Sequence, residues 1–351
     1  MSTPPQTLAD LEALARQRLD PAAWAYFAGG AADEHTLRAN VAAWAALHLR
    51  PRVLRRLNEA RLNVRLLGQD WPTPVLVAPM AHQRLAHAHA ERGMAMAAAA
   101  QGVGLVLSTL SSDPLEAVAE AVRQEPGRGP LWFQLYGLKD RGWWLELVRR
   151  AEAAGFDALV LTVDAPLNGV RDRERQAGFR LPAGLQAEAL PVSPHPPGLA
   201  GLMAQAPDWD DVAWLRSQTR LPLLLKGITH PQDATLALSM DVAGLVVSNH
   251  GGRVLDTLPP SAHLLPEVAH VVQGRCLLLV DGGLRRGTDI VKALALGADA
   301  VLLGRPVLWG LAAQGASGAA QALRWLLDEC LATLALCGLE GLEDLQDVLL
   351  G

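Results

Sequence analysis

The sequence has few of the residues that mark several common functional classes. Its 351 residues include three cysteines, Cys276, Cys330 and Cys337, which form no Cys-x-x-Cys pair and no recognisable metal-binding spacing. A disulfide framework is therefore not expected, and unpaired thiols fit a reducing cytoplasm. The formal net charge is −5 and the pI is near 6.1. That balance argues against binding to nucleic acid, which needs a basic surface.

Long apolar runs are also missing. A membrane-spanning helix needs roughly 18 consecutive apolar residues. The closest stretch, 94–107, is interrupted by Gln101, Gly102 and Gly104. The first ten residues, MSTPPQTLAD, lack the basic start and apolar centre of a signal peptide. We therefore expect a cytoplasmic protein that does not contact a membrane.

Eight short apolar segments, each bounded by Gly or Pro, recur along the chain. They are 75–78, 104–109, 131–136, 158–164, 221–226, 244–250, 276–281 and 300–305. Each has the length of a buried parallel strand, and segments with helical spacing, such as 141–154 and 231–240, separate most of them. Eight strand–helix units predict an α/β fold of the (β/α)8, or TIM barrel, type. The early Gly102-Val103-Gly104 precedes a strand instead of following one, which counts against a Rossmann fold.

The same pattern suggests how the chain is organised. We expect a single domain over residues 1–351, with an N-terminal helical extension over 1–70 and the barrel over 71–340. Residues 178–211 are rich in Pro, Gly and Ala and show no clean period. They are predicted to form a long loop after the fourth strand. Long loops in compact domains often act as lids over an active site.

Polar side chains follow the predicted strands at their carboxyl ends, where barrels of this type carry their chemistry. Gln134 lies at the end of the third strand, Thr162 and Asp164 at the end of the fourth, and Lys226 at the end of the fifth. We expect them to converge on one site. Lys226 is informative because the chain has only three lysines among its 31 basic residues. The chain uses lysine at this position although arginine is its usual basic residue. This choice indicates a specific role for the compact ammonium and argues against a lysine that is merely exposed to solvent at a strand end.

A second group of candidates follows the sixth strand in the segment SNHGGR. A lone histidine at a strand end, such as His250, is more often structural than catalytic. Arg253, three residues later, could clamp a substrate carboxylate through two hydrogen bonds. Asp164 could stabilise the imidazolium formed when His250 takes a proton. Together these three residues indicate a catalytic group.

Glycine-rich turns follow the last two strands, where barrels bind phosphate. Asp281, Gly282, Gly283 and Arg285 lie in the first turn, and Gly304-Arg305 forms the second. By contrast, the histidines after the first strand, at positions 82, 87 and 89, lack a carboxylate arrangement typical of a metal site. We expect an anion site and no metal.

Six ordered motifs carry a resemblance to a known family. They are YFAGGAADE, FQLYGLKDR, LTVDAP, LLLKGI, LVVSNHGGRVLD and DGGLRRGTDIVKALALGADAVLLGRP. Over Leu11 to about Leu339 the chain resembles the FMN-dependent L-2-hydroxy acid oxidases and dehydrogenases, which include lactate, glycolate and hydroxymandelate oxidases. The resemblance implies FMN as cofactor and oxidation of a small L-2-hydroxy acid, L-lactate favoured, with oxygen as acceptor and hydrogen peroxide as product. It also implies a homotetramer or homo-octamer.

The resemblance assigns roles position by position. His250, Asp164 and Lys226 match catalytic residues, with His250 as the base and Lys226 beside flavin N1. Substrate-binding positions match Tyr26, Tyr136, Arg171, His250 and Arg253. Cofactor-binding positions match Ala78, Pro79, Met80, Ser108, Gln134, Thr162, Lys226, Ser248, Asp281, Gly282, Gly283, Arg285, Gly304 and Arg305.

The chain departs from the family pattern in three places. Leu110 stands where glycolate-type members often have Trp, which should widen the substrate pocket. Residues 87–91 read His-Ala-His-Ala-Glu instead of His-Pro-Glu-Gly-Glu, and residues 178–211 contain no Tyr, unlike lactate oxidases. Segments 78–82 and 168–173 nevertheless resemble lactate and hydroxymandelate oxidases more than glycolate oxidase.

Several alternatives stay open from the sequence. The acceptor could be a quinone or a cytochrome instead of oxygen, and the substrate could be larger or aromatic, such as mandelate. Another FMN barrel, such as an isomerase acting on a diphosphate, would share the phosphate site but not the His250, Arg253 and Asp164 group. A flavin-binding protein without turnover would hold FMN and remain unreduced by any 2-hydroxy acid.

Overall fold

The computed structural model describes residues 4–136, 140–185, 187, 198–343 and 345–350. Its centre is a closed barrel with the strand order β10-β11-β4-β5-β6-β7-β8-β9, in which every neighbouring pair is parallel. Each of the eight predicted segments contains one strand, which confirms the (β/α)8 prediction. The strands are β4 (Val75–Val77), β5 (Gly104–Ser108), β6 (Leu131–Tyr136), β7 (Ala158–Thr162), β8 (Leu223–Lys226), β9 (Gly244–Val247), β10 (Leu277–Val280) and β11 (Ala300–Leu303).

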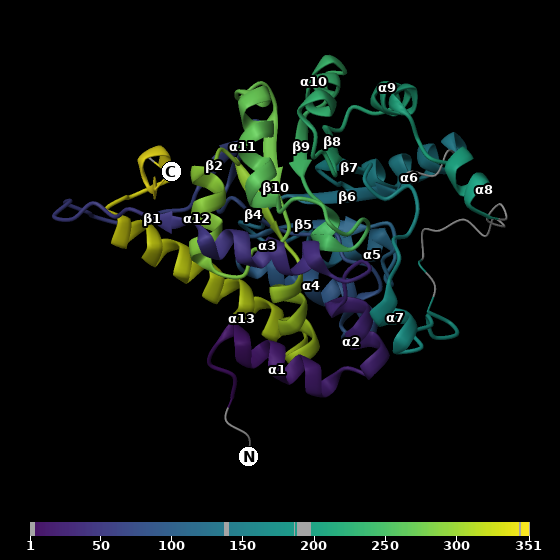
Figure 1. Cartoon of the computed structure of the whole chain (residues 1–351), viewed down its shortest axis with the longest axis horizontal. Helices are drawn as coiled ribbons and strands as arrows, with labels where there is room; N and C mark the ends of the chain where they lie inside the picture. The colour runs from purple at the N-terminus through teal and green to yellow at the C-terminus, as the bar shows by residue number, and fades with distance from the viewer. Residues whose placement is uncertain (1–3, 137–139, 186, 188–197, 344, 351) are drawn as a thin grey trace.

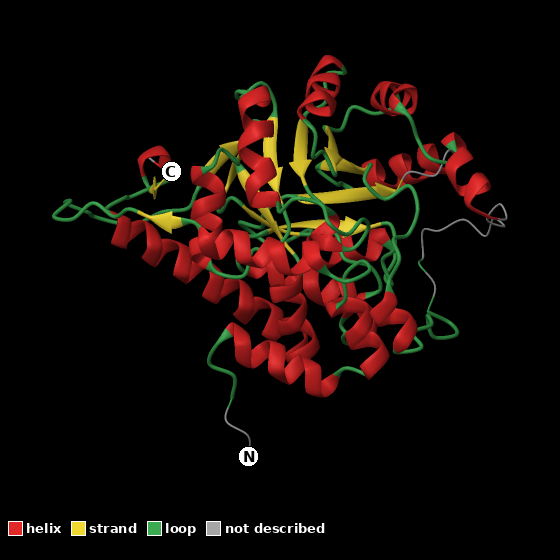
Figure 2. Cartoon of the chain, viewed as in Figure 1, coloured by secondary structure: helices red, strands yellow, loops and turns green. Residues whose placement is uncertain are grey.

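Helices surround this barrel (Figure 2). The predicted helices over 141–154 and 231–240 are confirmed as α6 and α10. The outer helices are α4 (Ala90–Ala100), α5 (Leu115–Val122), α6 (Arg141–Ala154), α9 (Trp209–Ser217), α10 (Pro231–Ser239), α11 (Ser261–Val272), α12 (Gly287–Ala295) and α13 (Arg305–Cys337). Short 3-10 turns occur at η1 (Gln83–Leu85), η2 (His250–Gly252) and η3 (Leu345–Asp347).

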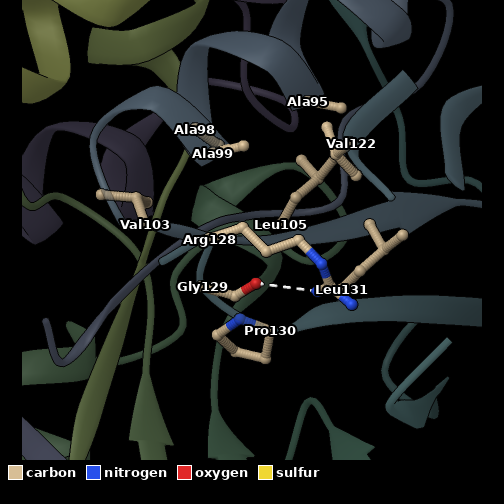
Figure 3. Close-up of a pocket in the computed structure, with 10 residues that line it drawn as sticks. All are labelled: Ala95, Ala98, Ala99, Val103, Leu105, Val122, Arg128, Gly129, Pro130 and Leu131. Atoms are coloured by element: carbon tan, nitrogen blue, oxygen red, sulfur yellow. Dashed lines mark hydrogen bonds between the residues drawn. The ribbon is translucent and has the colours of Figure 1, made fainter. Parts of the chain in front are cut away.

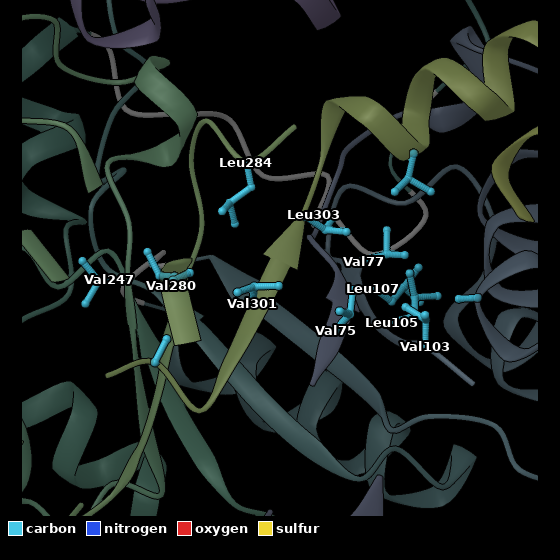
Figure 4. Packing of buried hydrophobic residues seen from close by; sticks show 14 of the residues in the cluster. Val75, Val77, Val103, Leu105, Leu107, Val247, Val280, Leu284, Val301 and Leu303 are labelled. Atoms are coloured by element: carbon cyan, nitrogen blue, oxygen red, sulfur yellow. The ribbon is translucent and has the colours of Figure 1, made fainter. Parts of the chain in front are cut away.

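Alternate residues of each strand face opposite sides of the barrel wall, as the period of a β-strand requires. Outward residues such as Val75, Val77, Val301 and Leu303 form a large apolar layer beneath the helices (Figure 4). The residues between them fill the barrel interior, and they include Leu76, Val106, Trp132, Val160, Leu224, Val246, Leu279 and Leu302. The interior is thus a packed core and not a channel.

The amino end of the barrel is covered by a hairpin of β2 (Val64–Leu66) and β3 (Gln69–Trp71). Trp71 is 2% exposed and meets Trp132 of the interior edge-to-face, with ring centroids 5.4 Å apart. Also near this end, a small crevice lies between α4, α5 and the first residues of β5 and β6 (Figure 3). Its lining is apolar except for Arg128, which pairs with Asp157. This end carries packing and no cluster of reactive groups among the described residues.

The N-terminal extension is helical, as expected, and consists mainly of α1 (Leu8–Arg18), α2 (Pro21–Ala28) and α3 (His35–Ala46). Helix α1 begins at a capping box formed by Thr7 and Asp10 and packs along α13 (Figure 1). Helix α3 packs against η2, α11 and α12. A short strand, β1 (His48–Leu49), then pairs with β12 (Leu349–Leu350) near the C-terminus. The extension therefore reaches the carboxyl end of the barrel.

The prediction of a continuous loop over 178–211 was wrong in part. Residues Gly198–Ala204 form helix α8, and α9 begins at Trp209 after a capping box of Asp208 and Asp211. The reason is local, since side-chain caps start a helix that apolar periodicity does not reveal. A further short helix, α7 (Asp172–Gln176), precedes the segment. Residues 186 and 188–197 lie outside the described part of the chain.

None of the helices in the described ranges is long and apolar enough to cross a membrane.

Candidate active site

The carboxyl end of the barrel carries a ring of inward-facing positions, each two residues beyond an apolar residue of the interior. The alternation of the strands predicts this ring, because the next inward position after Val106, Trp132 or Leu224 must face the same axis. Its members are Ala78, Ser108, Gln134, Thr162, Lys226, Ser248, Asp281 and Gly304. The sequence analysis named all eight as candidates. The structure brings them together at one end of the barrel.

Three ring residues form a hydrogen-bond chain along β5, β6 and β7. Ser108 Oγ donates to Gln134 Oε1 at 3.2 Å, and Gln134 Nε2 donates to Thr162 Oγ1 at 2.9 Å. All three side chains are buried. Because each amide and hydroxyl has a partner, the chain holds these groups in fixed orientations.

Lys226 is the buried cation of the ring. Its Nζ donates to Ser248 Oγ at 2.9 Å and lies 3.2 Å from Asp281 Oδ2. Burial lowers the pKa of Lys226, but the carboxylates of Asp281 and Asp164 outweigh it, so the pKa is raised above its ordinary value. The side chain therefore stays an ammonium in a largely buried position.

His250 and Asp164 form the pair that the sequence predicted. His250 Nδ1 lies 3.0 Å from Asp164 Oδ1, and the His250 backbone N–H donates to Ser248 Oγ at 3.0 Å. Burial would raise the pKa of Asp164, but the charges of His250 and Lys226 lower it overall. Gly227 makes room for this carboxylate, since a Cβ there would lie 2.4 Å from the Cβ of Asp164.

A cluster of two arginines and one glutamate lies near this pair, since the charges of Asp164 and Arg171 both act on the pKa of the buried Tyr136. Arg253 donates from Nη1 to the carbonyls of Tyr26 at 2.6 Å and Gly29 at 2.8 Å. Its Nη2 lies 3.2 Å from Glu174 Oε1, and the same oxygen lies 3.3 Å from Arg171 Nη1. The Arg253 guanidinium also sits 5.1 Å from the centre of the Tyr26 ring. Predicted substrate-side residues from three distant segments thus meet here.

Backbone contacts bring those three segments together. The Ala31 N–H donates to the Gly252 carbonyl and the Ala32 N–H to the Val170 carbonyl, both at 2.8 Å. Gly169 is required at the same junction, because a Cβ there would lie 1.9 Å from the Val254 carbonyl oxygen. The motifs YFAGGAADE, NGVRDR and NHGGRV therefore interlock.

Tyrosine side chains flank the cluster. Burial raises the pKa of Tyr136 to about 12, and burial also raises the pKa of Tyr26. Both phenols are therefore neutral hydrogen-bonding groups at neutral pH. The Tyr26 ring stacks on Phe179, with centroids 4.6 Å apart.

The predicted phosphate side is supported by helix α3. Gly282 and Gly283 have positive φ values of 96° and 84°, and a Cβ on Gly283 would lie 2.5 Å from the Asn40 backbone. Asn40 and Asn249 exchange two amide hydrogen bonds, at 2.9 and 2.8 Å. Trp44 Nε1 donates to the Gly282 carbonyl at 2.8 Å. The glycine turn is thereby held from the N-terminal extension.

The two predicted phosphate arginines have different surroundings. Arg305 donates to the carbonyls of Phe27, Gly29 and Gly251. Burial, together with the charges of Arg253 and Arg285, lowers its pKa well below the usual value. Arg285 donates to the Leu284 carbonyl, and burial lowers its pKa as well. Arg305 is thus tied to the α2 end and η2, whereas Arg285 borders the glycine turn.

Two of the three histidines of the first loop, His87 and His89, have structural partners. His87 Nδ1 accepts the His89 N–H, and His89 Nδ1 accepts the Ala316 N–H, both at 3.1 Å. Glu91, in the altered motif, is fully buried and accepts the Gln83 and Ser112 N–H groups. It joins the loops after β4 and β5.

Sequence reasoning missed four residues of this end, namely Asn40, Trp44, Glu174 and Phe179. Only Glu174 had a local signal, since it lies one helical turn after Arg171 in the run RDRER. Asn40 and Trp44 lie more than 200 residues before the turns they support, so no spacing rule could connect them.

Several buried polar atoms at this end have no hydrogen-bond partner among the described residues. They include Asp164 Oδ2, Arg171 Nε and Asp281 Oδ1, and, after β4, His82 Nδ1, Gln83 Oε1 and Glu91 Oε2. Buried polar atoms are almost always paired, so such a group indicates a place for a polar ligand. There is also room, because a Cβ on Gly304 would meet nothing closer than Met80 Sδ at 3.7 Å and Ala78 Cβ at 4.0 Å.

Comparisons with known proteins agree with this geometry. The family model for FMN-dependent dehydrogenase matches residues 15–351. An L-lactate oxidase of Nostoc sp. is 47% identical, over 97% of this chain and 96% of the relative. A peroxisomal (S)-2-hydroxy-acid oxidase of Oryza sativa subsp. japonica is 41% identical, over 95% and 92%. The crystal structure of a mandelate oxidase with (S)-2-phenylpropionate has a TM-score of 0.90 at 40% identity, covering 98% of both chains.

FMN, the family cofactor, fits the residues present. The site offers a buried ammonium, an amide and hydroxyl chain, a glycine turn with Arg285, and unpartnered buried polar atoms. These groups match a flavin that carries polar ring edges and a phosphate. Because the family model and the relatives match nearly the whole chain and the site fits FMN, the chain belongs to the FMN-dependent dehydrogenase family.

Proposed function

We propose that this enzyme oxidises a small L-2-hydroxy acid to the 2-oxo acid and passes the electrons to oxygen. L-lactate is the favoured substrate. With L-lactate the products are pyruvate and hydrogen peroxide, so two electrons and two protons leave the substrate and reach one oxygen molecule. The observation that carries the proposal is the His250–Asp164 pair at 3.0 Å beside the Arg171 and Arg253 guanidiniums. It joins a base to a carboxylate-binding group.

The two arginines are proposed to bind the substrate carboxylate. Arg253 uses three of its five donors on Tyr26, Gly29 and Glu174, which leaves two donors among the described contacts. Arg171 Nε is buried without a described partner. A carboxylate that met these free N–H groups would be oriented by charge-assisted hydrogen bonds. The neutral phenols of Tyr26 and Tyr136 would add hydrogen bonds to the same substrate.

His250 is proposed to take the proton of the substrate hydroxyl. Its Nδ1 is held by Asp164, so Nε2 is the nitrogen left to act as base. Asp164 has a lowered pKa and stays ionised, which stabilises the imidazolium after proton transfer. The Ser248 hydroxyl, which accepts the His250 N–H, fixes the backbone of the base.

The ring residues are proposed to hold FMN. Bound FMN supplies the two-electron redox chemistry. Lys226 would hold negative charge that develops beside its ammonium, a preorganised electrostatic contribution. Asp281, Gly283 and Arg285 would bind the ribityl and phosphate part. The remaining proposed contacts come from Ala78, Pro79, Met80, Ser108, Gln134, Thr162, Ser248, Gly282, Gly304 and Arg305.

L-lactate is favoured because three relatives that are 44–47% identical are named L-lactate oxidase. A larger substrate such as mandelate is the second candidate. Leu110, which replaces a family Trp, would leave room for it, and mandelate oxidases are structural neighbours at TM-scores near 0.90. A quinone or cytochrome acceptor is the alternative to oxygen.

Three further features of the protein are proposed. We place it in the cytoplasm, because its three cysteines are free. The family resemblance supports a homotetramer or homo-octamer. Residues 1–351 are proposed to act as one domain. Residues 178–185, the described stretch after α7, are proposed as part of the lid predicted over 178–211, since Phe179 stacks on the substrate-side Tyr26.

The test is anaerobic mixing of the purified yellow protein with L-lactate, L-mandelate, glycolate and longer L-2-hydroxy acids. Bleaching of the flavin band by L-lactate, faster than by the others, is expected. Oxygen uptake with stoichiometric peroxide would then support oxygen as acceptor. If no 2-hydroxy acid bleaches the flavin, the proposed reaction is wrong.

A further inference from the structure

Glu174 lies between the two arginines that are proposed to bind the substrate. One oxygen, Oε1, is 3.2 Å from Arg253 Nη2 and 3.3 Å from Arg171 Nη1. The three side chains are 14–18% exposed. A carboxylate of the protein therefore already occupies part of the surface that two guanidiniums present to a ligand.

The charges of this cluster can be counted. Two arginines and one glutamate carry a net charge of one positive unit. Neighbouring charges are paired separately, since Arg173 pairs with Glu34 and Lys226 pairs with Asp281. Asp164, paired with His250, is a further carboxylate near the cluster, since its charge and that of Arg171 both act on the pKa of Tyr136. Arg305 shares the Gly29 carbonyl with Arg253 and has carbonyl partners in the described contacts, and in the proposed function it is a contact of FMN. With FMN bound, the cluster therefore balances one substrate carboxylate.

Glu174 also supports the charged state of Arg253. Burial lowers the pKa of Arg253 and the nearby Arg171 lowers it further, whereas Glu174 opposes both effects. The shared oxygen also fixes both guanidiniums, because each donates to the same atom. The donors that remain, which include the buried Arg171 Nε, then keep a constant direction.

We propose that Glu174 is a specificity-determining residue, which makes the enzyme select 2-hydroxy acids with one carboxylate over those with two. This inference rests on the proposed function, because it takes Arg171 and Arg253 as the carboxylate-binding pair. A dianion held by these arginines through one carboxylate would bring its second charge close to Glu174, in a partly buried site. Two like charges within about 10 Å of each other in such a site disfavour binding by at least about tenfold.

The experiment measures binding without turnover. Propionate and malonate differ by one carboxylate in place of a methyl group, and neither can be oxidised as a 2-hydroxy acid. Each is titrated into the oxidised, FMN-loaded protein at mildly alkaline pH, and its dissociation constant is read from the change in the flavin spectrum. The wild type is expected to prefer propionate.

Three variants separate charge from position. Glu174→Gln keeps the shape and an acceptor oxygen but removes the charge. The affinity for malonate relative to that for propionate, which we call the malonate preference, should therefore rise at least about tenfold. Glu174→Asp keeps the charge, so the preference should stay as in the wild type even if both affinities change. Asp172→Asn is the matched control, since Asp172 lies on the same helix and pairs with the exposed Arg175. Its preference should be unchanged.

An equal change for both acids in Glu174→Gln, or no change, overturns the inference. A raised malonate preference in Glu174→Asp overturns it as well, and that variant decides the matter if Glu174→Gln fails to retain FMN. Absence of any spectral response to either acid in the wild type overturns the carboxylate pocket itself. Failure of L-2-hydroxy acids to bleach the flavin would instead refute the proposed reaction and leave these binding constants measurable.

Discussion

The two ends of the barrel are built from the same eight strands and differ in almost every other respect. At the amino end, Trp71 of the hairpin packs on Trp132 and closes the interior. At the carboxyl end, the next inward positions are Gln134, Thr162 and Lys226. The buried atoms without a hydrogen-bond partner among the described residues include charged groups at this end, Asp164 Oδ2 and Asp281 Oδ1, but only the neutral Trp71 Nε1 and Thr73 Oγ1 at the amino end. One end therefore gives stability, and the other gives up some stability to hold polar groups for a ligand.

This difference shows where the fold can bury charged side chains. A buried ammonium or carboxylate is costly unless it is paired, and Lys226 and Asp281 satisfy that condition within the ring. The hairpin end has no need of such pairs. Substitutions at the two ends should therefore separate activity from stability.

The largest effect is expected at the polar end. Replacing His250 with alanine removes the proposed base, and flavin reduction by L-lactate should slow by about 10³-fold. FMN content should stay near the wild-type value, whereas the unfolding midpoint should fall, because Asp164 loses the imidazole that pairs with it. Stopped-flow absorbance and the flavin-to-protein ratio check both. Undiminished reduction would remove His250 from the mechanism.

The opposite result is expected at the amino end. Trp71→Ala should lower the free energy of unfolding by about 3 kcal/mol, because it removes a buried aromatic side chain and leaves a cavity. The reduction rate per folded molecule should hardly change. Urea unfolding measures the loss, and Leu336→Ala, at a residue 77% exposed on α13, is the control. A clear fall in the reduction rate per folded molecule, with little change in the free energy of unfolding, would contradict the comparison of the two ends.

A smaller effect is expected where the N-terminal extension meets the polar end. Asn40→Ala leaves the buried Asn249 amide without its reciprocal partner, which costs about 1–3 kcal/mol. The Gly282–Gly283 turn loses its support, so FMN should be lost more readily on dialysis. Asn58→Ala, at an exposed position, is the control. Equal FMN retention in both variants would show that α3 does not support the cofactor turn.

The smallest effect concerns pH. The pKa of Asp164 is lowered in the folded state, where the charges of His250 and Lys226 outweigh burial. Its stabilising contribution is therefore present above the unfolded pKa, near 4, and is lost as the pH falls through the folded value. Asp164→Asn should flatten the decline in stability below about pH 4. Urea midpoints across an acid series would show this, and parallel curves for both proteins would refute it.

Much of the carboxyl end could be predicted from the sequence. The ring positions follow from strand alternation, and Lys226, His250, Asp164 and Arg253 were identified from residue type and position. The loop over 178–211 was predicted less well, because it contains α8 and because α9 begins at a local capping box instead of an apolar pattern. Roles for individual residues came from the family resemblance and still await the experiments above.

The sequence by itself determined the barrel, because eight short, nearly continuous apolar segments separated by helical segments are typical of parallel strands covered by helices. It also determined which residue types end those strands. Only the tertiary structure decided that Asn40 and Trp44 support the glycine turn and that Glu174 joins Arg171 to Arg253. The physical reason is range: strand alternation and helix periodicity act between near neighbours, whereas these contacts depend on how the extension and the loops pack across the mouth of the barrel.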